Sequence, residues 1–168
     1  MLSSFSKKLC FLFFGLLPAT RAFGLKILLL RNAGFYVDDG VRCVSSARFF
    51  LSGRLVIGAD TWIGHEVLVV GGRADIVIGA FCDIAPRVTF ASGSHQISPG
   101  GPHVAGAGYS LPISIGNGCW ICTGATILGG TIIGERSIVA AGSVVKGVFP
   151  ADVLIGGVPA RIIKNRLS

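Results

Sequence analysis

An aliphatic residue recurs every six positions through the C-terminal half of the chain, from Ile115 to Val145. An amphipathic helix repeats its apolar residues with a period near 3.6 and a half-buried strand with a period near 2, so a sustained period of six fits neither. Six is the period of a parallel β-helix, in which each hexapeptide supplies one short strand and one corner. The residues expected in the interior are Ile115, Ile121, Ile127, Ile133, Val139 and Val145.

The same register continues upstream, and small residues stand where strands should converge at corners. Thirteen hexapeptides can be followed in all. At three per turn, or about 18 residues, they predict a little over four turns. Three extra residues between Val69 and Ile78, within residues 71–74, are expected to bulge at a corner. The expected small corner residues are Cys119, Ala125, Thr131, Ser137 and Ser143, and the upstream interior residues are Leu51, Ile57, Ile63, Val69, Ile78, Ile84 and Phe90.

The composition agrees with one domain and with a thin prism in which every strand contributes interior residues. The chain has 168 residues, of which 14% are charged, and a mean hydropathy of +0.72. Its net charge of +7 is carried by scattered basic residues without an aromatic-basic motif, so no nucleic-acid partner is expected. Anionic small ligands or an anionic membrane surface account for the charge equally well.

Five cysteines form an odd set without the spacing of a disulfide scaffold. Cys119 and Cys122 have the CxxC spacing of redox and zinc sites. A zinc site would require a second pair, and a thioredoxin-type site would require a helix after the motif. Because Cys119 occupies a small corner position, both cysteines are interpreted as structural, and no metal is expected.

The N-terminal segment contains two short apolar runs, Leu9–Leu17 and Leu25–Leu30, the first preceded by Lys7 and Lys8. Neither run reaches the roughly 18 to 20 residues that span a bilayer. We expect one or two short helices that pack on the prism or associate peripherally with the inner membrane surface. A signal peptide cleaved after Ala22 is the alternative, but the odd number of cysteines favours a cytoplasmic location.

The hexapeptide register breaks for 25 residues between Phe90 and Ile115. Gly and Pro are frequent there, which predicts that residues 91–114 form a loop ejected from the prism, and long ejected loops are usually functional. Two of the three histidines lie in this loop. His95 stands where the last regular strand passes into the loop, and His103 lies farther along it.

Three parts of the chain follow from these patterns. Each turn of a solenoid buries its apolar face only against its neighbours, so both ends need a cap. We therefore expect an apolar, helical N-terminal segment at residues 1–35, the β-helix at residues 36–149, and a C-terminal capping extension at residues 150–168.

Three motifs are more selective than the hexapeptides: Gly93-Ser94-His95, Trp120-Ile121 and the ending Gly157-Val158-Pro159-Ala160-Arg161. With the hexapeptides around them, over residues 50–164, they resemble the left-handed β-helix, hexapeptide-repeat acetyltransferases. The similarity is greatest to the maltose and galactoside O-acetyltransferase branch and to relatives that act on capsule, O-antigen and exopolysaccharide sugars. Residues before about position 45 lie outside the resemblance.

The resemblance implies an all-β fold built as a left-handed parallel β-helix. It also implies a homotrimer with active sites in the grooves between neighbouring subunits. The activity implied is O-acetyl transfer from acetyl-CoA to a sugar hydroxyl of a surface glycan or of its precursor.

The resemblance makes His95 the general base, because acetyl transfer from a thioester to a hydroxyl requires removal of the hydroxyl proton and a neutral imidazole suits this task. It also assigns acetyl-CoA contacts, in which main-chain groups of two residues bind the pantetheine arm and two cations face the phosphates. Those contacts are Trp120, Thr123 and Ala141 (the last two through the main chain) and the cations Lys146 and Arg161.

Acceptor contacts are less defined. His65 and Glu66 fall near the place where relatives keep a polar residue, often Asn, that faces the acceptor, and this departure leaves the acceptor open. Asp83 is a candidate for orienting His95, although twelve residues separate them and would put them on different faces of a turn.

Other functions stay open from the sequence. A sugar N-acetyltransferase or a serine-acetyltransferase-like enzyme would share the fold and the acetyl donor. A zinc β-helix enzyme related to carbonic anhydrase would use three histidines, but His95 and His103 are eight apart and His65 lies in an earlier coil, which fits poorly. A β-helix scaffold without chemistry is the third class, and the displaced loop with His95 counts against it.

Overall fold

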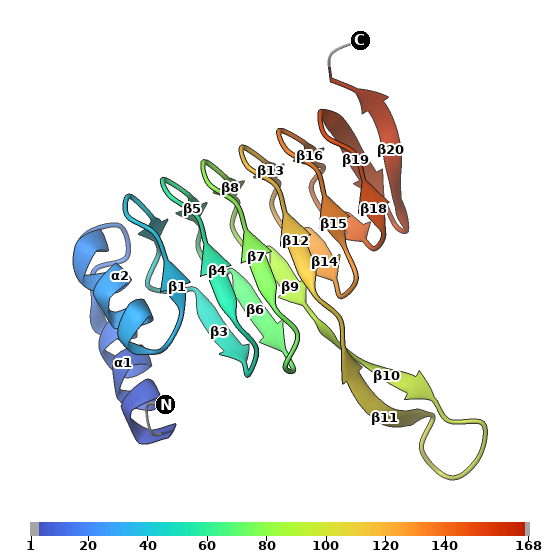
Figure 1. Ribbon diagram of the computed structural model, residues 1–168, viewed down its shortest axis with the longest axis horizontal. Helices are drawn as coiled ribbons and strands as arrows, with labels where there is room; N and C mark the ends of the chain where they lie inside the picture. The colour runs from blue at the N-terminus through green and yellow to red at the C-terminus, as the bar shows by residue number, and fades with distance from the viewer. Residues whose placement is uncertain (1–3, 167–168) are drawn as a thin grey trace.

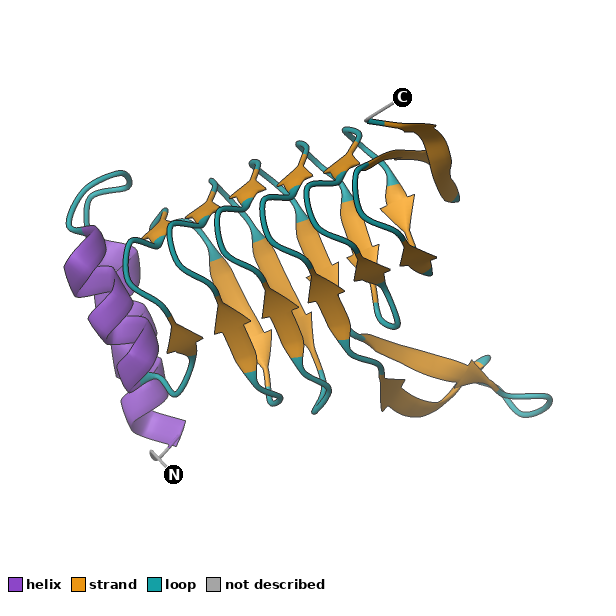
Figure 2. Ribbon diagram, turned by 45° about the horizontal axis from the view of Figure 1, so that its top comes forward, coloured by secondary structure: helices purple, strands orange, loops and turns teal. Residues whose placement is uncertain are grey.

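The chain forms a three-sided solenoid with two helices at one end and a hairpin that projects from its side (Figure 1, Figure 2). The computed structural model describes the backbone of residues 4–166 and the side chains of residues 8–166. About six turns of left-handed parallel β-helix stack along one axis. The prediction of an all-β, left-handed parallel β-helix is therefore confirmed.

Each turn contributes one short strand to each of three sheets, up to the C-terminal end of the solenoid. In stacking order, the first sheet contains β1 (Tyr36–Val37), β4 (Leu55–Ile57), β7 (Ile76–Ile78), β12 (Ile113–Ile115), β15 (Ile132–Ile133) and β18 (Val148–Phe149). The second contains β2 (Arg42–Cys43), β5 (Trp62–Ile63), β8 (Asp83–Ile84), β13 (Trp120–Ile121), β16 (Ile138–Val139), β19 (Val153–Gly157) and β20 (Ala160–Asn165). The third contains β3 (Arg48–Leu51), β6 (Leu68–Gly71), β9 (Thr89–Ala91), β14 (Thr126–Leu128) and β17 (Val144–Val145).

The six-residue period corresponds to columns of side chains that fill the interior. In the first sheet the parallel register pairs Ile57 with Ile78, Ile78 with Ile115, and Ile115 with Ile133. Successive side chains of a strand point to opposite faces, so the residues between these stay on the outer surface. Every interior residue expected from the sequence is buried, except Leu51.

A first turn precedes the hexapeptides that were counted from Leu51, so the solenoid has about six turns and not a little over four. Val37, Cys43 and Phe49 fill the interior of a first turn, and Leu51 is only half-buried. Phe49 and Ile57 are eight residues apart, because two extra residues bulge between β3 and β4. Leu51 happens to stand six residues before Ile57, and this coincidence concealed the bulge.

The small residues expected at corners are all buried, which confirms that part of the pattern. Cys119 donates its thiol to the carbonyl of Gly134 at 3.2 Å, and Ser137 donates to the carbonyl of Pro150 at 3.1 Å. Cys122 is half-buried beside this corner. Short side chains thus bond to the backbone of the next turn where strands converge.

Two helices cover the first turn: α1 (Ser4–Leu16) and α2 (Phe23–Asn32). Phe14 and Leu30 are each 1% exposed, so the inner side of each helix is packed on the solenoid end. The expected helical N-terminal segment is present, although residues 1–3 and the side chain of Lys7 lie outside the described part of the chain. Among the described helices, none combines the length and the apolar character needed to cross a bilayer.

Lys26 of α2 is fully buried, where its ammonium group donates to the carbonyls of Pro18 and Ala19 at 2.8 and 2.6 Å. Burial lowers the pKa of Lys26 from its ordinary value. Nearby, burial raises the pKa of the Cys43 thiol to about 12. The buried cation therefore ties the connection between the two helices to α2.

The expected loop after β9 is an antiparallel hairpin of β10 (Gly93–Ile97) and β11 (Ala105–Ser110) that projects from the solenoid (Figure 1). The sequence did not indicate strands, because residues 105–108 are Gly and Ala in alternation and lack the branched and aromatic side chains typical of strands. At the C-terminal end, β20 turns back antiparallel to β19 and closes the second sheet.

Candidate functional site

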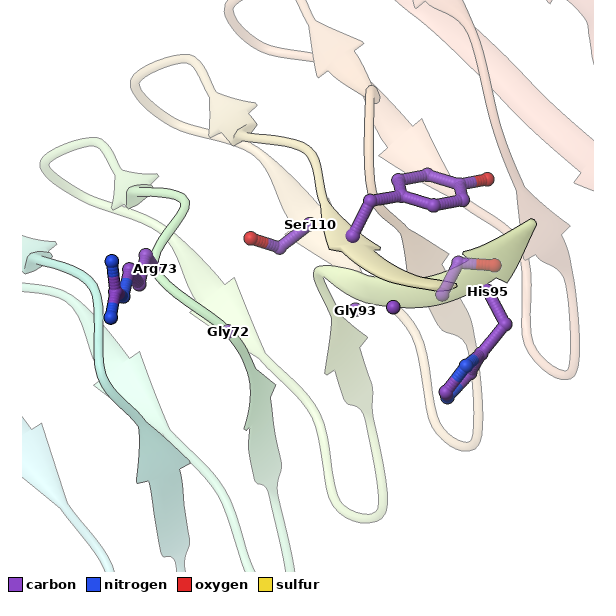
Figure 3. Close-up of a pocket in the computed structure, with 8 residues that line it drawn as sticks. Gly72, Arg73, Gly93, His95 and Ser110 are labelled. Atoms are coloured by element: carbon purple, nitrogen blue, oxygen red, sulfur yellow. The ribbon is translucent and has the colours of Figure 1, made fainter. Parts of the chain in front are cut away.

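A hollow of about 500 Å³ lies at the root of the hairpin. Two of its edges come from β10 and β11, and the third comes from the bulge that follows β6 (Figure 3). Its volume falls within the range of about 300–1,000 Å³ that is usual for small-molecule sites. The lining residues are Gly72, Arg73, Gly93, Ser94, His95, Gly108, Tyr109 and Ser110.

His95 lies on β10 and pairs across the hairpin with Gly108. Its Nδ1 is 2.9 Å from the carbonyl oxygen of Gly106. A carbonyl oxygen can only accept, so Nδ1 carries the proton in this bond, and in the neutral ring Nε2 is then free to accept one. The hairpin therefore fixes both the tautomer and the orientation that a general base at this position requires.

A smaller hollow of about 60 Å³ lies on the other side of the hairpin root. Gly93, Ser94 and Tyr109 line both hollows, and the exposed Lys146 lines only this one. Lys146 follows β17, at the same corner of the solenoid from which the hairpin leaves. The expected catalytic residue and one expected cofactor residue thus share one corner.

Four other expected residues lie along a different corner, between the second and third sheets. His65 accepts from the backbone of Arg87 through its carbonyl at 2.8 Å, and Thr123 accepts from Gly142 in the same way at 3.0 Å. These bonds show that the corner residues of successive turns are stacked. The four expected residues in this row are all exposed: His65, Glu66, Thr123 and Ala141.

Asp83 and Trp120 lie on the outer surface of the second sheet, where parallel pairing puts them side by side. Among the described residues, no hydrogen bond or ion pair joins Asp83 to His95, whose Nδ1 is occupied by the carbonyl of Gly106. Trp62, on the other side of Asp83, packs edge-on against Phe23 of α2 with ring centroids 6.1 Å apart. Trp120 is 51% exposed and remains open to a partner.

Arg161 lies at the start of β20 and is exposed. It pairs in register with Gly156, and the adjoining Gly157 donates its backbone N–H to Ser143 Oγ at 3.2 Å. Ser143 belongs to the corner that carries Ala141, so the β19–β20 turn lies beside this part of the expected cofactor surface.

The three histidines do not form one cluster. His65 Nδ1 is 3.3 Å from Ser46 Oγ, and His103 is exposed in the connection between β10 and β11. Among the residues that the structure describes, no group of three or more His, Cys, Asp or Glu side chains is arranged to hold a metal ion.

Sequence reasoning missed Arg73, Tyr109 and Ser110 as residues of the main hollow. The extra residues at 71–74 were recognised as a bulge, but a bulge by itself does not say which element it faces. Tyr109 and Ser110 were part of the expected loop, and only the pairing of β10 with β11 brings them beside His95.

A family model described as bacterial transferase hexapeptide (six repeats) matches residues 112–147. WbbJ of Escherichia coli (strain K12), provisionally named a lipopolysaccharide biosynthesis O-acetyl transferase, is 30% identical over 146 residues, which are 87% of this chain and 68% of the relative. Galactoside O-acetyltransferase of the same organism is 33% identical over 120 residues, or 70% of this chain. The chain spans only 56% and 57% of the length of two curated relatives that it matches, the second of which is this galactoside enzyme.

Among solved structures, a galactoside acetyltransferase in complex with coenzyme A superposes with a TM-score of 0.82. It is 26% identical, and the alignment covers 96% of this chain and 80% of that chain. The hexapeptide repeat, the β-helix and the similar sequences all indicate the same family. The chain belongs to the hexapeptide-repeat acetyltransferase family.

Proposed function

We propose that the chain transfers an acetyl group from acetyl-CoA to a sugar hydroxyl of a surface glycan or of its precursor, with His95 as the general base. The observation that carries this proposal is the bond between His95 Nδ1 and the Gly106 carbonyl, which leaves Nε2 free beside the hollow. A donor made inside the cell also supports a cytoplasmic location.

In this mechanism His95 Nε2 accepts the hydroxyl proton while the hydroxyl oxygen bonds to the acetyl carbonyl carbon. The negative charge that develops on the carbonyl oxygen needs donors aimed at it in advance, and backbone N–H groups of a neighbouring coil are the proposed source. When the carbon–sulfur bond breaks, His95 returns the proton to the departing thiolate. No covalent enzyme intermediate is needed.

The donor's contacts are proposed from the remaining surface residues. Lys146 makes no hydrogen bond or ion pair with any described residue, so its ammonium group is available for a phosphate. Thr123 and Ala141 are exposed on adjoining turns, where main-chain groups suit the amides of the pantetheine arm. Trp120 and Arg161 complete the proposed cofactor surface, and His65, Glu66 and Asp83 stay proposed acceptor contacts.

These residues divide between two corners of one chain, which favours a site assembled between subunits. We therefore propose a homotrimer in which His95 and Lys146 of one subunit face the other corner of its neighbour. Exposed apolar side chains on the outer surface of the solenoid support such contacts, including Phe81 at 64%, Ile132 at 49% and Val148 at 73%. Cyclic symmetry would close these contacts without forming a filament.

Peripheral membrane association is proposed from α1. Its exposed apolar residues have the spacing i, i+3, i+4 and i+7, so they form one stripe along the helix. Lys8 is exposed beside this stripe, and a basic residue at the edge of an apolar helix face suits an anionic bilayer. The stripe consists of Leu9, Leu12, Phe13 and Leu16.

An acceptor screen tests the proposed activity directly. Purified protein would be incubated with acetyl-CoA and a panel of galactosides, glucosides, glucosamine and serine, and free coenzyme A thiol would be measured. We expect thiol release with a glycoside and an alkali-labile acetyl ester on the product by mass spectrometry. Acetylation of glucosamine nitrogen would favour the N-acetyltransferase alternative. Absence of acetyl-CoA binding by calorimetry would contradict the enzyme proposal.

A further inference from the structure

The bulge after β6 is held firmly against the root of the hairpin. The backbone N–H of Ala74 donates to Ser110 Oγ of β11 at 3.1 Å. On its other side, the carbonyl of Gly72 accepts from the backbone of Ser52 and Gly53 at 3.1 and 2.9 Å. The bulge therefore has a defined position relative to the hollow, because it is bonded to elements on both sides.

Two glycines allow the bulge to approach the hairpin this closely. A Cβ atom at Gly71 would lie 1.8 Å from Ser92 Oγ, and one at Gly72 would lie 2.9 Å from Ser110 Oγ. A residue larger than glycine at position 71 would require Ser92, which directly precedes the hairpin, to shift. The close approach brings the next residue, Arg73, to the edge of the hollow that contains His95 (Figure 3).

Arg73 differs from the arginine of the preceding bulge. Arg54 pairs with Asp75, with 3.3 Å between Nε and the nearer carboxylate oxygen. Arg73 is exposed, and within the described chain it makes no ion pair and no side-chain hydrogen bond. No carboxylate lines the hollow, so nothing there neutralises the guanidinium group.

We propose that Arg73 binds an anionic group of the acceptor, a carboxylate or a phosphate, while His95 acts on a hydroxyl of the same sugar. Figure 3 shows Arg73 on the bulge after β6 and His95 on the hairpin, at the two ends of the hollow, so an acceptor that fills the hollow would contact both. A guanidinium group holds carboxylate and phosphate oxygens with two parallel hydrogen bonds. This inference rests on the proposed function and specifies it: the acceptor is an acidic saccharide or a sugar phosphate.

Matched acceptor pairs test this assignment. The carboxylate arm compares p-nitrophenyl glucuronide with p-nitrophenyl glucoside, and the phosphate arm compares glucose 1-phosphate with methyl glucoside. In the wild type we expect a higher kcat/KM for the anionic member of at least one pair. Arg73→Gln should lower kcat/KM for that member roughly 10- to 100-fold, mainly through KM, and change the neutral member little.

Two further variants separate the effect of the positive charge from that of the planar guanidinium group. Arg21→Gln removes the same charge from the exposed connection between α1 and α2, at the end of the solenoid away from the hollow, and should leave both acceptors unchanged. Arg73→Lys keeps the charge without the planar fork and should retain part of the preference. The thermal midpoint of each variant, followed by circular dichroism, would show that the fold is intact.

Three outcomes would overturn the assignment. Equal losses for charged and neutral acceptors would make Arg73 structural, and a raised KM for acetyl-CoA alone would assign it to the donor. A wild type that prefers neutral acceptors would also exclude an anion site. If no acceptor is acetylated, the proposed function fails, but binding of the same glycosides to the wild type and to Arg73→Gln, measured by NMR, still decides whether Arg73 recognises the anion.

Discussion

At the scale of single residues, the chemistry depends on which atoms the fold leaves free. The carbonyl of Gly106 occupies His95 Nδ1, and the bulge glycines bring Arg73 to the same hollow without an acidic partner. Both side chains are exposed, so their positions come from the backbone that carries them and not from burial. Small changes in that backbone should therefore affect function more than stability.

Replacing His95 with Ala should lower kcat by a factor of roughly 10² to 10⁴ and leave the KM for acetyl-CoA and the thermal midpoint nearly unchanged. His103→Ala is the matched control, since His103 is exposed near the tip of the hairpin and should matter much less. Equal losses from both substitutions would point to a folding defect of the hairpin.

The five cysteines should differ in their reaction with iodoacetamide at pH 8. Burial raises the pKa of the Cys43 thiol to about 12, so almost no reactive thiolate forms there in the folded protein. Cys82 and Cys119 are 1% exposed and should be protected by the fold, whereas the half-buried Cys10 and Cys122 should react first. Mass spectrometry of the alkylated peptides measures this, with unfolded protein as the control. Rapid labelling of Cys43 would show that the helices do not stay closed over the first turn.

At the scale of elements, the two sides of α1 have different surroundings. Phe14 packs into the solenoid end, and Phe11 stacks near Phe49 with ring centroids 6.3 Å apart. The opposite side carries the exposed stripe that includes Leu12 at 59% and Leu16 at 72%. A helix that only closed the solenoid would have no need for apolar residues on both sides.

Replacing Leu12 and Leu16 together with Asp should therefore abolish cosedimentation with vesicles of phosphatidylcholine and phosphatidylglycerol. Each lost Leu should weaken binding at least about tenfold, because about 1.5–3 kcal/mol of apolar burial is removed. Ile163→Asp, an equally exposed apolar position on β20, is the control and should bind as the wild type does. Unchanged sedimentation of the double variant would leave the stripe without a membrane role.

At the scale of the whole molecule, the outer surface of the solenoid is as informative as its interior. Ile132 and Val148 stand next to each other on the outside of the first sheet, in adjoining strands. Exposed apolar pairs of this kind suit a subunit contact, and the proposed site residues at two corners require one.

Light scattering should therefore give the mass of a trimer for the wild type. Ile132→Asp together with Val148→Asp should yield monomers without acetyl transfer, because charges would be buried unpaired at the contact. Leu28→Asp changes an equally exposed apolar residue on α2 and should remain trimeric. Full activity in a monomeric wild type would refute the shared site.

The sequence by itself determined the architecture and the position of the catalytic candidate. Interior residues such as Ile57, Ile121 and Val145 repeat at a local period, and a periodic apolar pattern fixes the fold wherever each turn repeats the same contacts. The break in that period marked the segment with His95. Only the tertiary structure showed which residues fill the first turn, how β10 pairs with β11, and that Arg73 lies at the hollow beside His95. Those features depend on contacts across turns, such as Ala74 with Ser110, and no local pattern encodes which distant groups will meet there.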